Sequence, residues 1–163
     1  MSKPDKTYTI GLVAHDNRKK ALVEWVEWNY EILRYHKLVC TGTSGKLVEK
    51  ALVSKLGPDE RENLHITKLK SGPLGGDQQL GALIAEGNID MLFFLWDPMQ
   101  PQPHDVDVKA LMRLAVVYNV PIAINRATAD FLISSTLMGS NYKPILTDYS
   151  LYIDRSMTNL GLK

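Results

Sequence analysis

An aspartate that closes a glycine-rich run is the first candidate for acid–base chemistry in this sequence. Asp77 ends the run 71–77, Ser-Gly-Pro-Leu-Gly-Gly-Asp, and two glutamines follow it directly. Glycine permits close backbone approach and positive φ angles, and proline fixes φ, so the run specifies a particular loop shape. Asp77 also stands where a loop meets a predicted helix, as a capping aspartate does. The residues alone leave both roles open, general base and helix cap.

A histidine beside two carboxylates is the second candidate. His104 follows Pro103 and precedes Asp105 and Asp107, at the start of another predicted helix. An imidazole in such company is held in one tautomer and can donate a hydrogen bond to a substrate oxygen. In the alternative interpretation Asp105 or Asp107 caps the helix and the histidine is exposed to solvent.

Hydroxyl-rich and basic residues make up a candidate phosphate site. The run 41–45, Thr-Gly-Thr-Ser-Gly, offers three hydroxyls just before a predicted helix, whose first amides favour anions. The run lacks the lysine of a Walker-type loop, and an ordinary helix cap also explains it. His15 and Asp16 follow the first predicted strand, and Lys19 comes one helical turn later, within reach of a phosphate, although a solvated lysine is the simpler alternative.

The elements that must position these residues alternate along the chain. Strands are expected at 8–14, 38–40, 64–69, 91–96 and 121–124, and helical patterns at 20–33, 47–52, 78–86, 106–118 and 127–134, the last helix expected. Beyond 134 the tail shows no regular pattern. The alternation predicts an α/β fold: a single doubly wound three-layer domain over 1–163, with a five-stranded parallel sheet. Ligands of such folds bind outside the carboxyl ends of the strands, so the polar loops should converge on one edge.

Composition excludes several classes of function. The formal charge of the 163 residues is +1, which favours neither nucleic acid nor an anionic membrane surface as a partner. The single cysteine, Cys40, cannot form an intramolecular disulfide, and the four histidines have no metal-ligand spacing, so no metal is expected. His36 and His65 fall near strand starts, at the edge away from the predicted site. The polar N-terminus is unlike a signal peptide, and the apolar run 91–96 is too short to span a bilayer, so a cytoplasmic protein is expected.

Taken together, these blocks resemble the methylglyoxal synthase family. The resemblance is carried by 14–16, 41–45, 71–79, 96–98, 103–111 and 127–131, in order between residues 10 and 149. It implies a methylglyoxal synthase-like fold with flavodoxin-like layering. It also implies a lyase that converts dihydroxyacetone phosphate to methylglyoxal and inorganic phosphate without a cofactor, through an enediol(ate). Phosphate is then both product and expected inhibitor.

The resemblance also implies roles for individual residues. By position, Asp77 matches the catalytic base and His104 the residue that polarises the substrate oxygens. The positions matching substrate and phosphate binding are His15, Lys19, Thr41, Gly42, Thr43, Ser44, Ser71 and Gly72; Ser44 stands where many members have threonine. Asp107, placed with the catalytic residues, and Asp16 and Asp97 match acidic residues that tune the site. Family members are typically homohexamers in which a C-terminal arginine, here Arg155, reaches the phosphate of a neighbouring subunit.

Two other functions fit part of the pattern. A non-catalytic phosphate- or nucleotide-sensing domain, as in carbamoyl phosphate synthetases, would keep a Thr-Gly-Thr-like loop but would not need Asp77 together with His104. An isomerase acting on triose phosphates would share the enediolate. For Asp77 to act as a base, its pKa should stay below neutral or be only modestly raised, and glycine amides and Lys19 are the groups expected to supply that effect.

Overall fold

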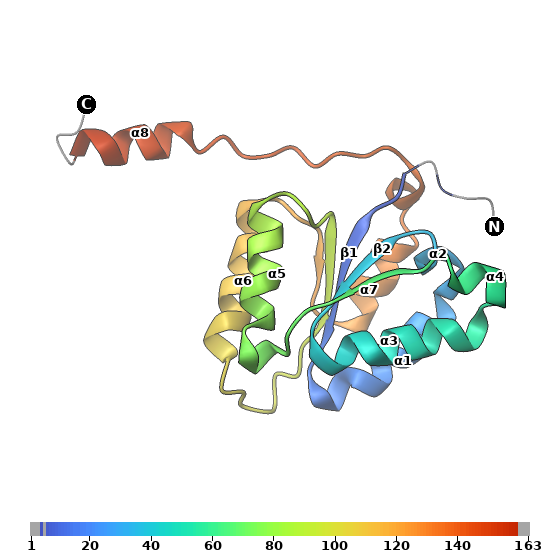
Figure 1. The fold of residues 1–163 in the computed structure, drawn as a ribbon. Helices are drawn as coiled ribbons and strands as arrows, with labels where there is room; N and C mark the ends of the chain where they lie inside the picture. The colour runs from blue at the N-terminus through green and yellow to red at the C-terminus, as the bar shows by residue number, and fades with distance from the viewer. Residues whose placement is uncertain (1–3, 5, 160–163) are drawn as a thin grey trace.

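Five parallel strands form one sheet in a computed structural model of the protein, which describes residues 4 and 6–159 (Figure 1). The strands are β1 (Thr9–Ala14), β2 (Lys37–Cys40), β3 (His65–Lys68), β4 (Met91–Leu95) and β5 (Ile122–Ala123). Their order in the sheet is β3-β2-β1-β4-β5. The chain therefore builds outward from β1 to β3 and then returns to the other side of β1, which puts the switch in strand order between β1 and β4. The predicted doubly wound parallel sheet is confirmed.

Helices cover both faces of this sheet. Helices α1 (Lys19–Trp28), α3 (Gly42–Lys55) and α7 (Arg126–Ile133) pack on one face, and α5 (Gly76–Ala85) and α6 (Asp105–Val117) on the other (Figure 1). Successive side chains of β4 alternate between the two cores: Phe93 packs with Trp25 of α1, and Phe94 with Leu111 of α6. Every residue of β4 is buried, as expected for a central parallel strand covered on both sides.

Two helices differ from the prediction in ways that concern the site. The predicted helix over 20–33 is interrupted at Asn29, which is buried and donates from Nδ2 to the carbonyl of Trp25, and a short helix α2 (Tyr30–Leu33) follows. Helix α3 begins at Gly42 rather than near Leu47, so the run 41–45 is the helix's first turn and not a loop before it. This turn lacks apolar side chains, and hydrophobic periodicity therefore did not reveal it.

The C-terminal segment leaves the body of the domain. After α7 come a short 3₁₀ turn (Thr136–Gly139), an extended stretch, and helix α8 (Ser150–Asn159), which stands away from the sheet in Figure 1. Tyr149 Oη donates to the carbonyl of Val117 at 3.3 Å, and Asn119 Nδ2 donates to the carbonyl of Ile145 at 2.9 Å. The expectation that the helix near 127–134 is the last one is therefore wrong.

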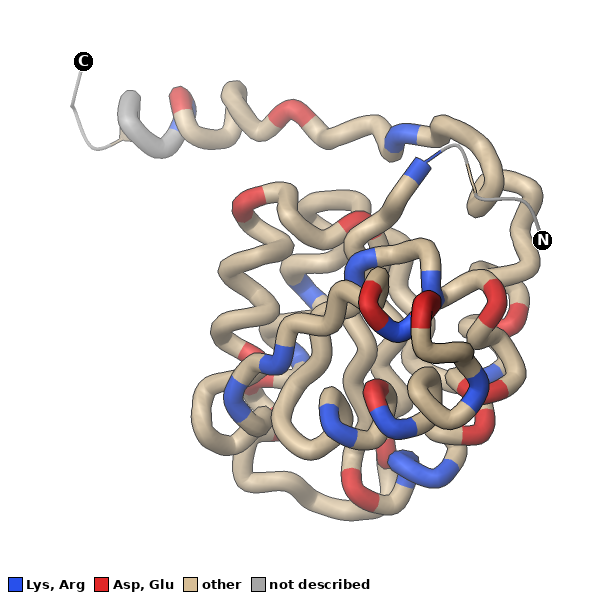
Figure 2. The backbone as a smooth tube through the Cα atoms, turned by 45° about the vertical axis from the view of Figure 1, so that its right-hand side comes forward, with Lys and Arg blue, Asp and Glu red and all other residues tan. Residues whose placement is uncertain are grey.

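Charges of both signs are interspersed over the backbone of the domain (Figure 2). Among the described residues, no helix has the length and apolar character needed to cross a membrane. A short helix, α4 (Pro58–Arg61), lies between α3 and β3 and buries none of its own side chains.

Candidate active site

The loops that follow the strands meet at the carboxyl edge of the sheet, beside the switch between β1 and β4, and line a cavity of about 90 Å³. Among the candidate residues from the sequence, the cavity is lined by His15, Asp16, Lys19, Thr41, Gly42, Thr43, Ser44, Ser71, Gly72, Asp77 and His104. The structure also brings Val13, Ala14, Pro73, Phe94 and Gln102 to its wall. Residues as far apart in sequence as Val13 and His104 thus share one small space.

Asp77 lies in the first turn of α5 and faces the cavity. The cap of this helix is Gly75, at φ 99°, and no side chain makes the cap hydrogen bond, so the interpretation of Asp77 as a capping residue is wrong. Its side chain is only 2% exposed, and Oδ2 has no hydrogen-bond partner among the described residues. The nearest polar group recorded for that oxygen is Nε2 of His104, at 3.6 Å. A buried carboxylate oxygen without a hydrogen-bond partner lowers the stability of the fold unless a ligand bonds to it.

Two glycines allow close packing in the loop before Asp77. A Cβ on Gly76 would lie 2.0 Å from the carbonyl oxygen of Lys70, which no side chain could tolerate. A Cβ on Gly72 would lie 2.8 Å from His104 Nε2 and 3.0 Å from Asp77 Oδ2. The space above the carboxylate and the imidazole therefore exists because position 72 has no side chain.

Burial raises the pKa of Asp77 above its ordinary value, because the charged carboxylate loses solvation. The neighbouring His104 opposes this shift, Asp107 adds to it, and His15 opposes it more weakly. Lys19, expected to act on this carboxyl group, instead bonds to Asp16 and Thr43. The two histidines therefore supply the opposing effect that the sequence interpretation assigned to lysine.

His15 is held as a neutral donor. Its Nδ1 accepts a hydrogen bond from the backbone N–H of Asp97 at 3.2 Å, so the neutral ring carries its proton on Nε2. That Nε2 is buried and has no partner among the described residues. Burial, and then the nearby His104, lower the pKa of His15, which keeps the ring uncharged at neutral pH. The ring packs edge-on against Phe94 at 5.1 Å and against the His104 ring at 5.6 Å.

His104 is buried, with 7% of its surface exposed, so the alternative with an exposed histidine is wrong. It occupies the cap position of α6 but makes no side-chain cap hydrogen bond. The preceding loop is held instead by Asp105, whose Oδ2 accepts from the backbone N–H of Gln102 at 3.2 Å. Like Oδ2 of Asp77, Nδ1 of His104 is buried without a partner among the described residues.

Asp97 acts on the cavity from outside its wall. Its carboxylate accepts from Asn17 Nδ2 at 2.9 Å and from the backbone N–H of Met99 at 3.1 Å, and these bonds lower its pKa. The same residue donates its backbone N–H to His15. Asp97 therefore joins the loop after β1 to the loop after β4 and fixes the tautomer of the histidine.

The hydroxyl-rich turn lies next to the start of the Asp77 loop, because the N–H of Gly42 donates to the carbonyl of Lys70 at 3.0 Å. Thr41 caps α3 by position but makes no side-chain cap hydrogen bond, so capping does not account for its hydroxyl. Lys19 Nζ donates to the hydroxyl of Thr43 and, at 2.5 Å, to Asp16, whose pKa is lowered mainly by that bond. The first amides of a 14-residue helix, hydroxyl groups and an ammonium group together form an anion site.

Two further candidates lie outside the cavity wall. Asp107 is half-buried on α6 and acts on Asp77 through its charge. Arg155 is exposed on α8, which stands away from the body of its own chain (Figure 1). Gln102 is the polar lining residue that sequence reasoning missed. Its position in the proline-rich loop after the fourth strand was the available signal, because that loop ends at the same edge of the sheet.

Among the residues that the structure describes, no group of three or more histidine, cysteine, aspartate or glutamate side chains could hold a metal ion. The donor set of the cavity combines an anion site with two imidazoles and two carboxylates, of which Asp16 is paired with Lys19 and Asp77 is not paired with a lysine or arginine among the described residues. Such a set can remove a proton from a carbon acid and stabilise the oxyanion that forms.

Comparison with known proteins gives a consistent result. A family model described as an MGS-like domain matches residues 21–124. The chain is 54% identical over 155 residues to the methylglyoxal synthase of Maridesulfovibrio salexigens, covering 93% of this chain and 99% of that relative. It is 49% identical to the methylglyoxal synthase of Coxiella burnetii, covering 90% of this chain and 95% of that relative. The crystal structure of methylglyoxal synthase from Elizabethkingia anophelis NUHP1 matches with a TM-score of 0.80 at 48% identity, over 91% of each chain.

Proposed function

The chain belongs to the methylglyoxal synthase family, and from this premise we propose that it is a lyase that converts dihydroxyacetone phosphate to methylglyoxal and inorganic phosphate. The observation that carries the proposal is the buried pair of Asp77 and His104, with Oδ2 and Nε2 3.6 Å apart, beside an anion site at the start of α3. A phosphate sensor would need the anion site but not this pair.

In the proposed mechanism Asp77 removes a proton from the hydroxymethyl carbon of the substrate. Its Oδ2 is free of hydrogen bonds to the described residues and is therefore available to that carbon. The raised pKa makes the carboxylate a stronger base than an exposed aspartate, while His104 and His15 limit the rise. The proton passes to the carboxylate, and its electron pair forms an enediolate with the substrate carbonyl.

The two imidazoles stabilise the negative charge on the enediolate oxygens. His15 presents an Nε2–H that is fixed by the bond from Asp97 to Nδ1, so the donor is in place before the charge develops. His104, whose ring packs edge-on against that of His15, polarises the same oxygens. A neutral imidazole is suited to this task because it donates a hydrogen bond without taking the proton needed by the base.

The enediolate then expels phosphate. The electron pair forms a new carbon–carbon double bond while the carbon–oxygen bond to phosphate breaks, and the resulting enol rearranges to methylglyoxal. The leaving phosphate is held by Thr43, Ser44 and Lys19 at the positive end of α3. Because the product carries the same phosphate group, inorganic phosphate is expected to inhibit by occupying this site.

The test is to supply dihydroxyacetone phosphate and to measure methylglyoxal and inorganic phosphate together. Equal amounts of both are expected. Release of neither by folded protein would reject the enzyme in favour of a phosphate-sensing domain, and interconversion with the aldehyde isomer alone would favour an isomerase. Asp77→Asn should lower kcat by at least about 10³-fold while phosphate binding is kept, because the amide cannot accept the proton. Asp59→Asn, the same change on exposed α4, is the matched control.

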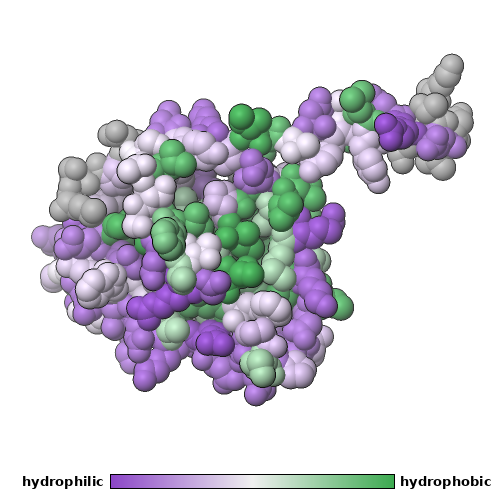
Figure 3. Space-filling model, turned by 180° about the vertical axis from the view of Figure 1, so that it is seen from behind, coloured by the Kyte–Doolittle hydropathy of each residue, from purple (hydrophilic) through white to green (hydrophobic). Residues whose placement is uncertain are grey.

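We further propose that the chain acts as a homo-oligomer, a hexamer by family resemblance, in which Arg155 reaches the phosphate site of a neighbouring subunit. The support is that α8 stands away from its own domain and exposes Leu151, Tyr152 and Ile153 (Figure 1). Apolar residues also gather on the face of the body seen from behind, in a band that runs toward this arm (Figure 3). Exposed apolar surface of this kind favours burial against another chain. A cytoplasmic location remains part of the proposal, and native mass measurement tests the assembly.

A further inference from the structure

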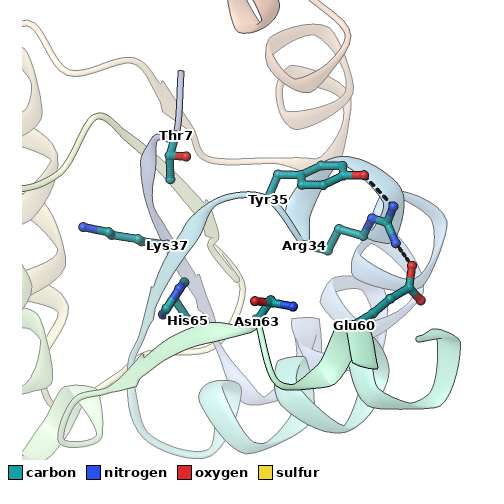
Figure 4. Close-up of a pocket in the computed structure, with 7 residues that line it drawn as sticks. All are labelled: Thr7, Arg34, Tyr35, Lys37, Glu60, Asn63 and His65. Carbon is teal, nitrogen blue, oxygen red and sulfur yellow. Dashed lines mark hydrogen bonds and ion pairs between the residues drawn. The ribbon is translucent and has the colours of Figure 1, made fainter. Parts of the chain in front are cut away.

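A second and larger cavity lies at the opposite edge of the sheet, where β1, β2 and β3 begin. Its volume is about 540 Å³, and it is lined by Thr7, Arg34, Tyr35, Lys37, Glu60, Asn63 and His65 (Figure 4). Its described lining residues are all different from those of the proposed catalytic cavity. Small-molecule sites in proteins typically measure about 300–1,000 Å³, so this space is large enough for a metabolite.

One wall of the cavity is built by a segment that contributes nothing to the core. Helix α4 has no buried residue of its own, yet Glu60 fixes it in place. That carboxylate accepts from the backbone N–H of Gly57 at 3.0 Å and pairs with Arg34, whose guanidinium also bonds to the hydroxyl of Tyr35 (Figure 4). The guanidinium lies 4.6 Å from the centre of the Tyr35 ring. Polar contacts therefore hold an otherwise exposed segment over the cavity.

The opposite wall comes from the first residues of the strands. Lys37 of β2 is in register with His65 of β3, so the two side chains leave the same face of the sheet as neighbours. Thr7, just before β1, adds a hydroxyl group beside them (Figure 4). A lysine, an imidazole and a hydroxyl group thus line this side of the cavity, with the Lys37 side chain extending away from Tyr35 and Arg34 (Figure 4).

The charge of the lining favours an anion. Among the described lining residues the one carboxylate, Glu60, is already paired with Arg34, so these two charges offset each other. Lys37 has no ion pair or side-chain hydrogen bond with any of the described residues, and its charge is left without compensation. In addition, Nε of Arg34 is buried and has no partner in the described part of the chain.

We propose that this cavity binds a small aromatic anion of the aryl phosphate type. The phosphate lies against Lys37 and His65, and the planar ring lies toward Tyr35 on the other wall. The site is independent of the proposed catalytic function. β1 separates the two cavities, and six residues at about 3.3 Å each correspond to roughly 20 Å, so a ligand at one site does not exclude phosphate from the other.

Phenyl phosphate is a suitable probe for titration calorimetry of the full chain. The titration is run without inorganic phosphate on the Lys19→Ala variant, in which the hydroxyl-rich turn at the proposed catalytic site has lost its ammonium group. One binding event per chain is expected to remain, and Lys37→Ala should weaken it about tenfold, because a charge-assisted hydrogen bond is lost. Lys50→Ala, which removes an exposed lysine from α3 outside the cavity, should leave the affinity unchanged.

His65→Ala is a second variant at the same wall and should also weaken binding. Absence of binding by the Lys19→Ala chain in phosphate-free buffer would overturn the proposal. So would equal affinities of the Lys37→Ala and Lys50→Ala variants, since binding would then take place elsewhere. Failure of the chain to turn over dihydroxyacetone phosphate would leave this result unaffected, because the titration does not depend on catalysis.

Discussion

Replacing Gly72 by alanine adds one methyl group next to Asp77 and His104, the two residues proposed to carry the reaction. The added Cβ would lie 2.8 Å from His104 Nε2 and 3.0 Å from Asp77 Oδ2. Gly72 is not among the residues with positive φ, so alanine can adopt its backbone conformation. The effect of the substitution is therefore confined to the crowding of the carboxylate and the imidazole.

The size of the effect follows from these distances. Ordinary van der Waals contact begins at 3.4 Å, so His104 or the loop must move by roughly 0.6 Å, the difference between 3.4 and 2.8 Å. A misplacement of about 1 Å costs on the order of 100-fold in rate. We therefore expect kcat/KM to fall between about tenfold and about 100-fold, equivalent to roughly 1.4–2.7 kcal/mol of transition-state stabilisation. Overpacking of about 1–3 kcal/mol should lower Tm by about 2–10 °C.

The assay follows methylglyoxal formation from dihydroxyacetone phosphate at 25 °C, with thermal unfolding recorded on the same samples. Most of the loss should appear in kcat, because the added methyl group does not touch the anion site at α3. Gly139→Ala is the matched control, since a Cβ at that position meets no atom within 4 Å. Its activity and Tm should equal those of the wild type.

A folded Gly72→Ala variant with wild-type kcat/KM would refute the reasoning. It would mean either that the two groups tolerate this displacement or that they do not carry the reaction. A rise in KM with unchanged kcat would also contradict it, because the methyl group would then disturb only substrate binding.

Three further perturbations test features around the site. Burial lowers the pKa of His36 to about 4. Between pH 6.5 and 4 the unfolded chain therefore binds a proton that the folded chain does not bind. The free energy of unfolding should fall by about 3 kcal/mol as the pH drops through that window. Urea titrations should show a flatter pH dependence for His36→Gln, and an unchanged one would contradict this assignment. Burial raises the pKa of Cys40 to about 12, so a thiol reagent should react only after denaturation, and rapid labelling of native protein would show that the residue is accessible. Asn17→Ala removes the hydrogen bond to the Asp97 carboxylate and should lower kcat/KM about tenfold with little change in Tm. Activity equal to that of the wild type would show that this bond does not contribute to catalysis.

Local patterns in the sequence were sufficient for the fold class. Five apolar segments separated by helical patterns predicted the parallel sheet, and the structure has strands within or overlapping all five ranges. The ends of helices and strands were predicted less accurately. The start of α3 at Gly42, for example, depends on hydrogen bonds from the N–H of Gly42 to the carbonyls of Leu69 and Lys70. Those partners are distant in sequence, so no local pattern reports them. Helix α8 was missed because its apolar side chains have no core to face within this chain.

The sequence by itself determined which chemical groups the protein has and, through the alternation of strands and helices, that their loops share one edge of the sheet. It did not decide between Asp77 as a cap and Asp77 as a buried group, nor between a solvated and a buried His104. Those alternatives differ in burial and in distances of a few ångströms, which depend on how remote segments pack. Only the tertiary structure shows that Gly75 is the cap residue of α5 and that Oδ2 of Asp77 has no hydrogen-bond partner among the described residues. It also shows that the backbone N–H of Asp97 fixes the proton of neutral His15 on Nε2.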